Sequence, residues 1–254
     1  MRVAEDLDSL EILYRDEHLV AVNKPAGLLV HRTRIDTREV RFLLQAVRDQ
    51  IGTHVHPVHR LDKGTSGVVL FALHAESARR LANAFRDVQV RKTYVAVVRG
   101  YAPEQLVVDH ALRDRRDSFA PREIQVRSAV TDVQRIACAE FAIAVGRYST
   151  ARYSLVACQP RTGRRHQVRR HMKHLHHPVI GDANYGDGAH NRFFRDNLGV
   201  ARLLLAATAI RFQHPFSRNE IEIRAPLDDS FRKVLMLPEW RPALSERDPW
   251  LSIR

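Results

Sequence analysis

The chain has 254 residues, of which 44% are apolar, so it can bury a substantial core in one large domain or two small ones. Its 41 Lys and Arg residues outnumber 29 Asp and Glu, and the formal charge of +12 favours a polyanionic partner such as nucleic acid. Two cysteines, an acidic N-terminus and an apolar stretch (VARLLLAATAI) of about half a membrane span argue against a disulfide scaffold, a signal peptide and a membrane helix. We therefore expect a soluble, cytoplasmic protein without membrane contact.

Short alternating or β-branched runs predict strands along the chain. In order they are EILY (11–14), HLVAV (18–22), GLLVH (27–31), SGVVLF (66–71), TYVAVVRG (93–100), QLVVDH (105–110), RYSLVAC (152–158) and IEIRAP (221–226). Helical patterns occupy about 75–88, 163–175 and 229–236, and the polar, Arg-rich segment 113–123 is expected to be a surface loop.

Strands outnumber helices in this pattern, and few long crossovers are available. The sequence therefore predicts an α+β fold, with a mixed, mainly antiparallel sheet and flanking helices. We expect a single domain over 1–254, with its core at about 10–236 and an irregular C-terminal tail.

The loop HRLDKGTSG carries three charged side chains, those of Arg60, Asp62 and Lys63, just before an apolar run. A turn before a strand does not require this charge. Taken alone, however, Asp62 fits an Asx-type turn, and from the loop alone that structural role is the favoured interpretation.

The segment TGRRHQVRRHMKHL begins at Thr162, which could cap the N-terminus of a helix. Val168, Met172 and Leu175 follow helical spacing and predict an apolar stripe facing the core. Basic side chains crowd around this stripe and repel one another, which indicates phosphate or a buried acid opposite them. Asp62 is the candidate for that acid.

Histidines cluster at the end of this segment, and their HxxH spacing could suit zinc. A structural zinc site needs four ligands, and only Asp182 offers a nearby carboxylate, so we expect no metal. One histidine should face the core and the others solvent; they are His171, His174, His176 and His177. Neither a P-loop nor a dinucleotide fingerprint occurs, so no nucleotide cofactor is expected.

Four motifs occur in the order HRLDKGTSG, RKTYVAVVRG, TGRRHQVRRH and HHPVIGDANYG. Together they resemble the RluA family of pseudouridine synthases, and the likeness extends from NKPAGLLVH to APLDD at 225–229. Within that family, NKPAGLLVHRTRID, GRYSTARYSL and HNRFF resemble the members that modify uridine 65 of tRNA, in its acceptor and T-stem region. The resemblance implies an isomerase that converts uridine to pseudouridine in RNA without a metal or organic cofactor.

The resemblance also implies roles for individual residues. Asp62 matches the catalytic aspartate, Tyr94 the tyrosine that stacks on the uracil, and Arg169 an arginine that would pair with Asp62. Arg60 matches the arginine that can enter the RNA where the target base has left. The other residues expected to bind RNA are Lys63, Lys92, Arg164, Arg165, His166 and Arg170.

Two positions depart from the family pattern. Arg165 stands where most relatives have Thr or Ser, and Ala206 where His is common, which affects local packing more than chemistry. No S4-type RNA-binding module is expected before the catalytic domain. We expect a monomeric enzyme acting on RNA, above all tRNA.

Alternative functions are a synthase for ribosomal RNA, a binding-only RNA protein and a small DNA-binding protein. Pure binding would not need Asp62, Tyr94 and Arg169 together, and the sequence shows no legible helix-turn-helix or zinc finger.

Overall fold

The computed structural model describes residues 9–32, 40–115, 124–240, 242 and 244. The chain divides into two compact units. Unit 1 comprises residues 1–92, 205–232 and 247–254, and unit 2 comprises residues 93–204 and 233–246.

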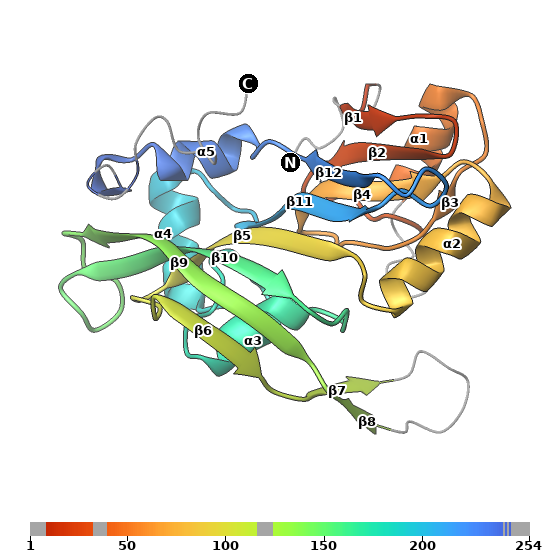
Figure 1. Cartoon of the computed structure of the whole chain (residues 1–254). Helices are drawn as coiled ribbons and strands as arrows, with labels where there is room; N and C mark the ends of the chain where they lie inside the picture. Colours follow the sequence, from red (N-terminus) through yellow and green to blue (C-terminus); the bar gives the residue numbers. More distant parts are fainter. Residues whose placement is uncertain (1–8, 33–39, 116–123, 241, 243, 245–254) are drawn as a thin grey trace. The chain divides into compact units, whose positions relative to one another are not determined.

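Unit 1 is built on a sheet whose strands follow the order β1-β2-β4-β11-β12, with β3 also paired to β4 (Figure 1). Every pair is antiparallel except β4 with β11. All seven residues of β4 are buried, so this strand is covered on both faces. The strands are β1 (Ile12–Arg15), β2 (Leu19–Lys24), β3 (His56–Pro57), β4 (Ser66–Ala72), β11 (Leu205–Gln213) and β12 (Glu220–Arg224).

Two helices complete unit 1. Helix α2 (Ala75–Arg86) contributes Leu81 to an apolar cluster that includes Leu70 of β4 and Phe212 of β11. Helix α1 (Leu43–Ile51) buries its apolar face and ends at a glycine in the left-handed region, the usual C-terminal signal.

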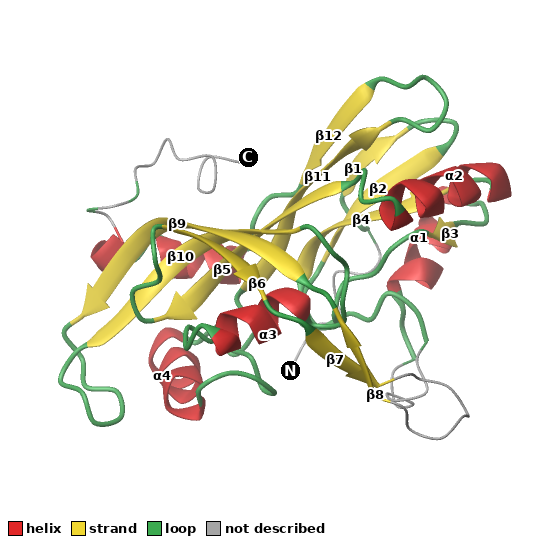
Figure 2. Cartoon of the chain, turned by 60° about the horizontal axis from the view of Figure 1, so that its bottom comes forward, coloured by secondary structure: helices red, strands yellow, loops and turns green. Residues whose placement is uncertain are grey.

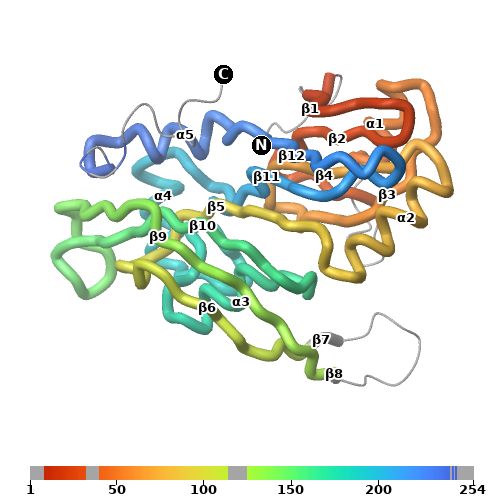
Figure 3. The backbone as a smooth tube through the Cα atoms, in the orientation of Figure 1, coloured from red at the N-terminus to blue at the C-terminus, as the bar shows by residue number. Residues whose placement is uncertain are grey.

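Unit 2 contains an antiparallel sheet in the order β5-β10-β9-β6, and a separate hairpin of β7 and β8. Figure 2 shows helices α3 and α4 beside the sheet, and Figure 3 follows the path of the long β9–β10 hairpin. The elements are β5 (Arg91–Arg99, whose first two residues belong to unit 1), β6 (Gln105–Asp109), β7 (Leu112–Arg115), β8 (Ile124–Arg127), β9 (Val130–Phe141), β10 (Ala151–Pro160), α3 (Gln167–His174) and α4 (Gly188–Leu198). Helix α5 (Asp229–Leu235) and a 3₁₀ turn (Pro238–Trp240) follow β12.

The predicted fold class is confirmed, since both units combine mainly antiparallel sheets with helices. The strand predicted at 27–31 is wrong: only Leu29 forms an isolated bridge, to Phe42, and Gly27 turns the chain with φ 86°. The loop expected at 113–123 is in part the β7–β8 hairpin, and residues 116–123 lie outside the described residues.

The helix predicted at 163–175 begins later, at Gln167, and Thr162 is not its N-cap. The N-cap is His166, in the left-handed region with φ 54° and without a capping side-chain hydrogen bond. Thr162 instead donates its hydroxyl to Gln167 Oε1 at 2.7 Å, and Arg164 N donates to the same oxygen at 3.0 Å. These bonds fold residues 162–166 into a turn rather than a helical start.

Gly67 of β4 tests how closely two backbones approach in unit 1. Its φ is +110°, and a Cβ there would lie 2.0 Å from the carbonyl oxygen of Ala207 on β11. Gly67→Ala should therefore destabilise the protein by roughly 3 kcal/mol or more in urea unfolding. Gly52→Ala is the matched control, because φ is +71° and nothing lies within 4 Å, so only backbone strain of about 1 kcal/mol applies. Equal losses would contradict the close approach.

Candidate active site

The Asp62 loop immediately precedes β4 in unit 1. A backbone hydrogen bond from Thr65 N to Asp62 O, 3.1 Å, closes a turn over residues 62–65. Leu61 is buried on one side of Asp62, whereas Asp62 is half-buried and Arg60 is exposed. The turn therefore places the half-buried Asp62 on a backbone anchored by its neighbours.

The buried ammonium group of Lys24 holds this loop in place through hydrogen bonds to backbone carbonyls. Lys24, at the end of β2, is fully buried and donates to the carbonyl oxygens of Pro25 at 2.8 Å, Leu28 at 2.7 Å and Lys63 at 3.1 Å. Gly27 N also donates to Lys63 O, at 2.8 Å. The turn after β2 and the Asp62 loop are thus held together through Lys63.

His59 fastens the start of the loop to β4. Its Nε2 accepts a hydrogen bond of 2.9 Å from Leu70 N, and its ring stacks on Phe85 of α2 with centroids 4.9 Å apart. Burial, together with the nearby charge of Lys92, lowers the pKa of His59 to about 3. His59 is therefore neutral at physiological pH and serves as an anchor.

Burial and neighbouring positive charge lower the pKa values of basic residues around this loop. The pKa of His31 is lowered by burial and by the charge of Arg60. Lys92, at the start of β5, is half-buried, and burial lowers its pKa. Unit 1 thus brings together four predicted site residues, Arg60, Asp62, Lys63 and Lys92.

In unit 2, Gln167 organises the turn that carries the second group of predicted residues. It is buried, and its side-chain nitrogen donates to Val130 O at 2.9 Å and Thr131 Oγ1 at 3.0 Å on β9. Because Gln167 also accepts from Arg164 N, the turn is fixed to the sheet. Arg164 is half-buried there and Arg165 is exposed.

Arg169 lies on α3 in a buried ion pair with Asp182. Its Nε and Nη2 donate to the two carboxylate oxygens at 2.6 and 2.8 Å, and the side chains are 10% and 0% exposed. Burial alone would raise the pKa of Asp182, but hydrogen bonds and charge from Arg169, with backbone donors at Tyr185 and Asn184, hold it below its ordinary value. The pair is therefore ionised and fixes the Arg169 guanidinium.

Tyr185 borders this ion pair. The Arg169 guanidinium carbon lies 5.2 Å from its ring centroid, and its hydroxyl is 3.1 Å from His166 Nδ1. Arg170, the next residue of α3, donates a hydrogen bond to Arg113 O at 2.9 Å. Tyr94 is half-buried on β5, opposite Cys158 of β10. Unit 2 thus holds the other predicted site residues: Tyr94, Arg164, Arg165, His166, Arg169 and Arg170.

The predicted partner of Arg169 was Asp62, which belongs to the other unit, so that pairing stays a prediction. Sequence reasoning gave no role to Lys24, Asp182 or Tyr185. Asp182 and Tyr185 lie in the quoted motif HHPVIGDANYG, and a buried acid opposite the basic helix was expected, so the signal was present but its position was not identified.

The prediction for the histidines is confirmed for three of them but is wrong for His177, which is half-buried with its Nδ1 2.8 Å from Arg99 O. His171 is fully buried, with its ring nitrogens 2.9 Å from Thr131 Oγ1 and 3.0 Å from His110 O, whereas His174 and His176 are exposed. Within the part of the chain that the structure describes, no group of three or more His, Cys, Asp or Glu residues could hold a metal ion. No described helix is long and apolar enough to cross a membrane.

The carboxylate-bearing turn of unit 1 and the basic helix of unit 2 suit an enzyme that acts on a polyanion. The RNA pseudouridylate synthase family matches residues 18–174, and the chain belongs to that family. It is an RNA pseudouridine synthase, and the resemblance to the RluA family is confirmed.

Individual relatives cover nearly the whole chain. It is 47% identical to a tRNA pseudouridine synthase C of Vibrio cholerae serotype O1 over 239 residues, 92% of this chain and 98% of that one. A tRNA pseudouridine synthase C of Pasteurella multocida is 47% identical over 236 residues, 91% and 97% of the two chains. The solved structure of human RNA Pseudouridylate Synthase Domain Containing 1 matches with a TM-score of 0.68 and 27% identity, covering 89% of this chain and 86% of that one.

A double-mutant cycle tests the buried pair. Arg169→Ala or Asp182→Ala alone should cost about 3–5 kcal/mol of unfolding free energy, because each leaves a buried charge, and the double variant should lose less than the sum. The exposed pair Arg161–Asp132 has the same two-bond geometry, at 2.7 and 2.5 Å, and its coupling should be several-fold smaller than that of the buried pair. Similar couplings in urea unfolding would contradict a buried, structural role.

The low pKa of His59 predicts a pH-dependent stability. Between pH 6.5 and about 3, His59 is protonated in the unfolded chain but neutral in the folded chain. The free energy of unfolding therefore falls as the pH falls. Relative to His59→Gln, the wild type should lose roughly 1.4 kcal/mol per pH unit below 6.5, or about 2 kcal/mol by pH 5. Urea unfolding of both proteins measures this difference, and a constant offset across pH would refute it.

Proposed function

We propose that this enzyme converts uridine to pseudouridine in tRNA, at position 65 in the acceptor and T-stem region. The observation that carries the tRNA assignment is the 47% identity, over more than nine-tenths of the chain, to proteins named tRNA pseudouridine synthase C. The position rests on the motifs NKPAGLLVHRTRID and HNRFF, which resemble the members that act there.

Asp62 is proposed as the catalytic residue. The reaction breaks the bond from C1′ to N1 of uracil, forms a bond from C1′ to C5, and moves the C5 proton to solvent while N1 gains one, so no atoms are gained. An ionised carboxylate can attack C1′ or accept a proton in this sequence, and both routes use the same group. Its half-buried position on a turn held by Lys24 supports this role.

Tyr94 and Arg169 are proposed to act beside Asp62. Tyr94 offers a half-buried ring for stacking on the extruded uracil. Arg169 is held in place by Asp182, and we propose that in the assembled enzyme its guanidinium lies beside the Asp62 carboxylate. Both units would then form one catalytic domain, as the family match across residues 18–174 supports.

The remaining basic residues are proposed to hold the RNA. Extruding a base from a stem costs a few kcal/mol, and the exposed Arg60 could occupy the vacated space. A stacked stem is read mainly through its backbone, which suits cations. Those proposed for phosphate contact are Lys63, Lys92, Arg164, Arg165, His166 and Arg170. We further propose that the enzyme acts as a monomer in the cytoplasm, where its two free cysteines suit a reducing environment.

Mapping pseudouridine after incubation with unmodified tRNA and ribosomal RNA transcripts tests the function. We expect a carbodiimide-dependent primer-extension stop at uridine 65 of tRNA. Asp62→Asn should abolish the stop while leaving tRNA affinity within about threefold, because the carboxylate serves the reaction and not the phosphates. A stop confined to ribosomal RNA would refute the substrate, and turnover by Asp62→Asn would refute the catalytic assignment.

A further inference from the structure

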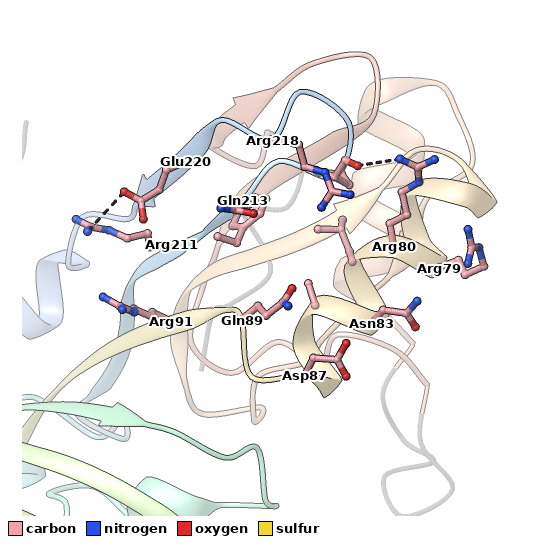
Figure 4. A pocket seen from close by; sticks show the side chains of 14 residues that line it. Arg79, Arg80, Asn83, Asp87, Gln89, Arg91, Arg211, Gln213, Arg218 and Glu220 are labelled. Atoms are coloured by element: carbon pink, nitrogen blue, oxygen red, sulfur yellow. Dashed lines mark hydrogen bonds and ion pairs between the residues drawn. The ribbon is translucent and has the colours of Figure 1, made fainter.

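A groove of about 630 Å³ lies in unit 1 between α2 and the β11–β12 hairpin (Figure 4). Five arginines and only two carboxylates line it, which leaves three net positive charges. The arginines are Arg79 and Arg80 of α2, Arg91 at the start of β5, Arg211 of β11 and Arg218 of the hairpin turn; the acids are Asp87 and Glu220. Like charges gathered in a concave site favour a polyanionic ligand.

Three of these five arginines form ion pairs and two do not, within the described part of the chain. Arg79 and Arg80 share one carboxylate, that of Glu76, and Arg211 pairs with Glu222. Arg91 and Arg218 form no ion pair with any residue in the described part of the chain. These two guanidinium groups are therefore the ones most able to bind an external anion.

The hairpin turn that carries Arg218 is held rigidly. Arg218 adopts φ 64°, a left-handed conformation that costs on the order of 1 kcal/mol for a residue other than glycine. His214 maintains the turn by accepting hydrogen bonds from Phe216 N and Ser217 N at 3.4 and 3.1 Å. Phe216 in turn stacks on His18 at 3.8 Å between ring centroids. The Arg218 backbone is therefore preorganised at the groove.

The groove is distinct from the Asp62 loop. Successive side chains of a strand point to opposite faces, so Arg91 and Lys92 at the start of β5 face opposite ways. Lys92 lies near His59 of the Asp62 loop, whereas Arg91 lines the groove. A ligand in the groove would therefore not occupy the proposed catalytic site.

We propose that this groove binds a stretch of the sugar–phosphate backbone of the substrate tRNA, as a second contact beyond the catalytic loop; this inference rests on the proposed function. Arginine forms two-bond contacts with phosphate. The amides of Asn83, Gln89 and Gln213 can donate to phosphates and bond ribose hydroxyls, and Asp87 and Glu220 can accept from a 2′-hydroxyl. Figure 4 shows Arg218 and Gln89 entering the groove from opposite sides. This mixture favours RNA over DNA and over an acidic protein.

The test compares Arg91→Ala/Arg218→Ala with a control that removes the same charge from exposed sites, Arg15→Ala/Arg147→Ala. At about 0.15 M salt the groove variant should bind unmodified tRNA about tenfold to thirtyfold more weakly, and its log–log salt slope should flatten by about 1.4–1.8, as expected for two lost phosphate contacts. The control should change affinity less than about threefold. At saturating tRNA the groove variant should keep wild-type kcat, with a raised KM. Arg91→Lys/Arg218→Lys should retain most of the affinity.

Further measurements separate the ligand classes. A DNA hairpin of the same sequence should lose less affinity than tRNA on mutation of the groove, and equal losses would overturn the assignment to RNA. Loss of binding to polyglutamate without loss of tRNA binding would overturn it in favour of an acidic protein. If the groove variant binds tRNA like the control while the wild type modifies tRNA, this inference is wrong and the proposed function stands. If the wild type forms no pseudouridine in tRNA, the proposed function fails whatever the groove binds.

Discussion

The buried ammonium group of Lys24 is the interaction on which the Asp62 loop depends. A charge removed from water is costly unless strong hydrogen bonds replace its hydration, and three backbone carbonyls within 3.1 Å of Lys24 Nζ provide them. Two of these carbonyls belong to the turn after β2, and the third belongs to Lys63, next to Asp62. The need to satisfy one buried cation therefore fixes the backbone beside the proposed catalytic carboxylate.

The same constraint explains one failure of sequence reasoning. GLLVH has an apolar run typical of a strand, but Leu28 directs its carbonyl to Lys24, and Gly27 turns the chain so that its N–H reaches the Lys63 carbonyl. The strands β2 and β4 could be predicted because their apolar runs are continuous and their surroundings bury both faces. Local composition cannot anticipate that the Leu28 carbonyl binds a buried cation or that the Gly27 N–H binds the distant Lys63 carbonyl.

Strand β9 was missed for a different reason. The consecutive residues Leu155 and Val156 of β10 pair with Ala137 and Arg135, which are not consecutive in β9. The register between the two strands therefore shifts at this point. A bulge of this kind interrupts the alternation of apolar and polar side chains, and that alternation is the signal from which a half-buried strand is recognised. No strand was therefore predicted between 130 and 141.

The secondary-structure elements that carry the candidate residues were easier to predict than the ion pairs between their side chains. Charge crowding on α3 indicated phosphate or a buried acid, with Asp62 as the candidate, because unpaired arginines so close together would repel one another. The acid that lies against Arg169 within unit 2 is Asp182. Which acid meets Arg169 depends on the turn after α3, where backbone N–H groups of Asn184 and Tyr185 hold the Asp182 carboxylate in position. Such a turn is a tertiary arrangement, and the spacing of 13 residues between Arg169 and Asp182 does not encode it.

The arginines of this chain therefore fall into two electrostatic classes. Arg169 is buried against a carboxylate and is screened little by salt, so it contributes to a fixed geometry at any physiological ionic strength. Exposed arginines such as Arg91 and Arg218 lie in water, where added salt weakens their attraction for phosphate. Raising the salt concentration should consequently release RNA before it disturbs the fold. Under the proposed function, exposed cations within the formal charge of +12 would bind RNA, whereas buried, paired cations such as Arg169 would position the reaction.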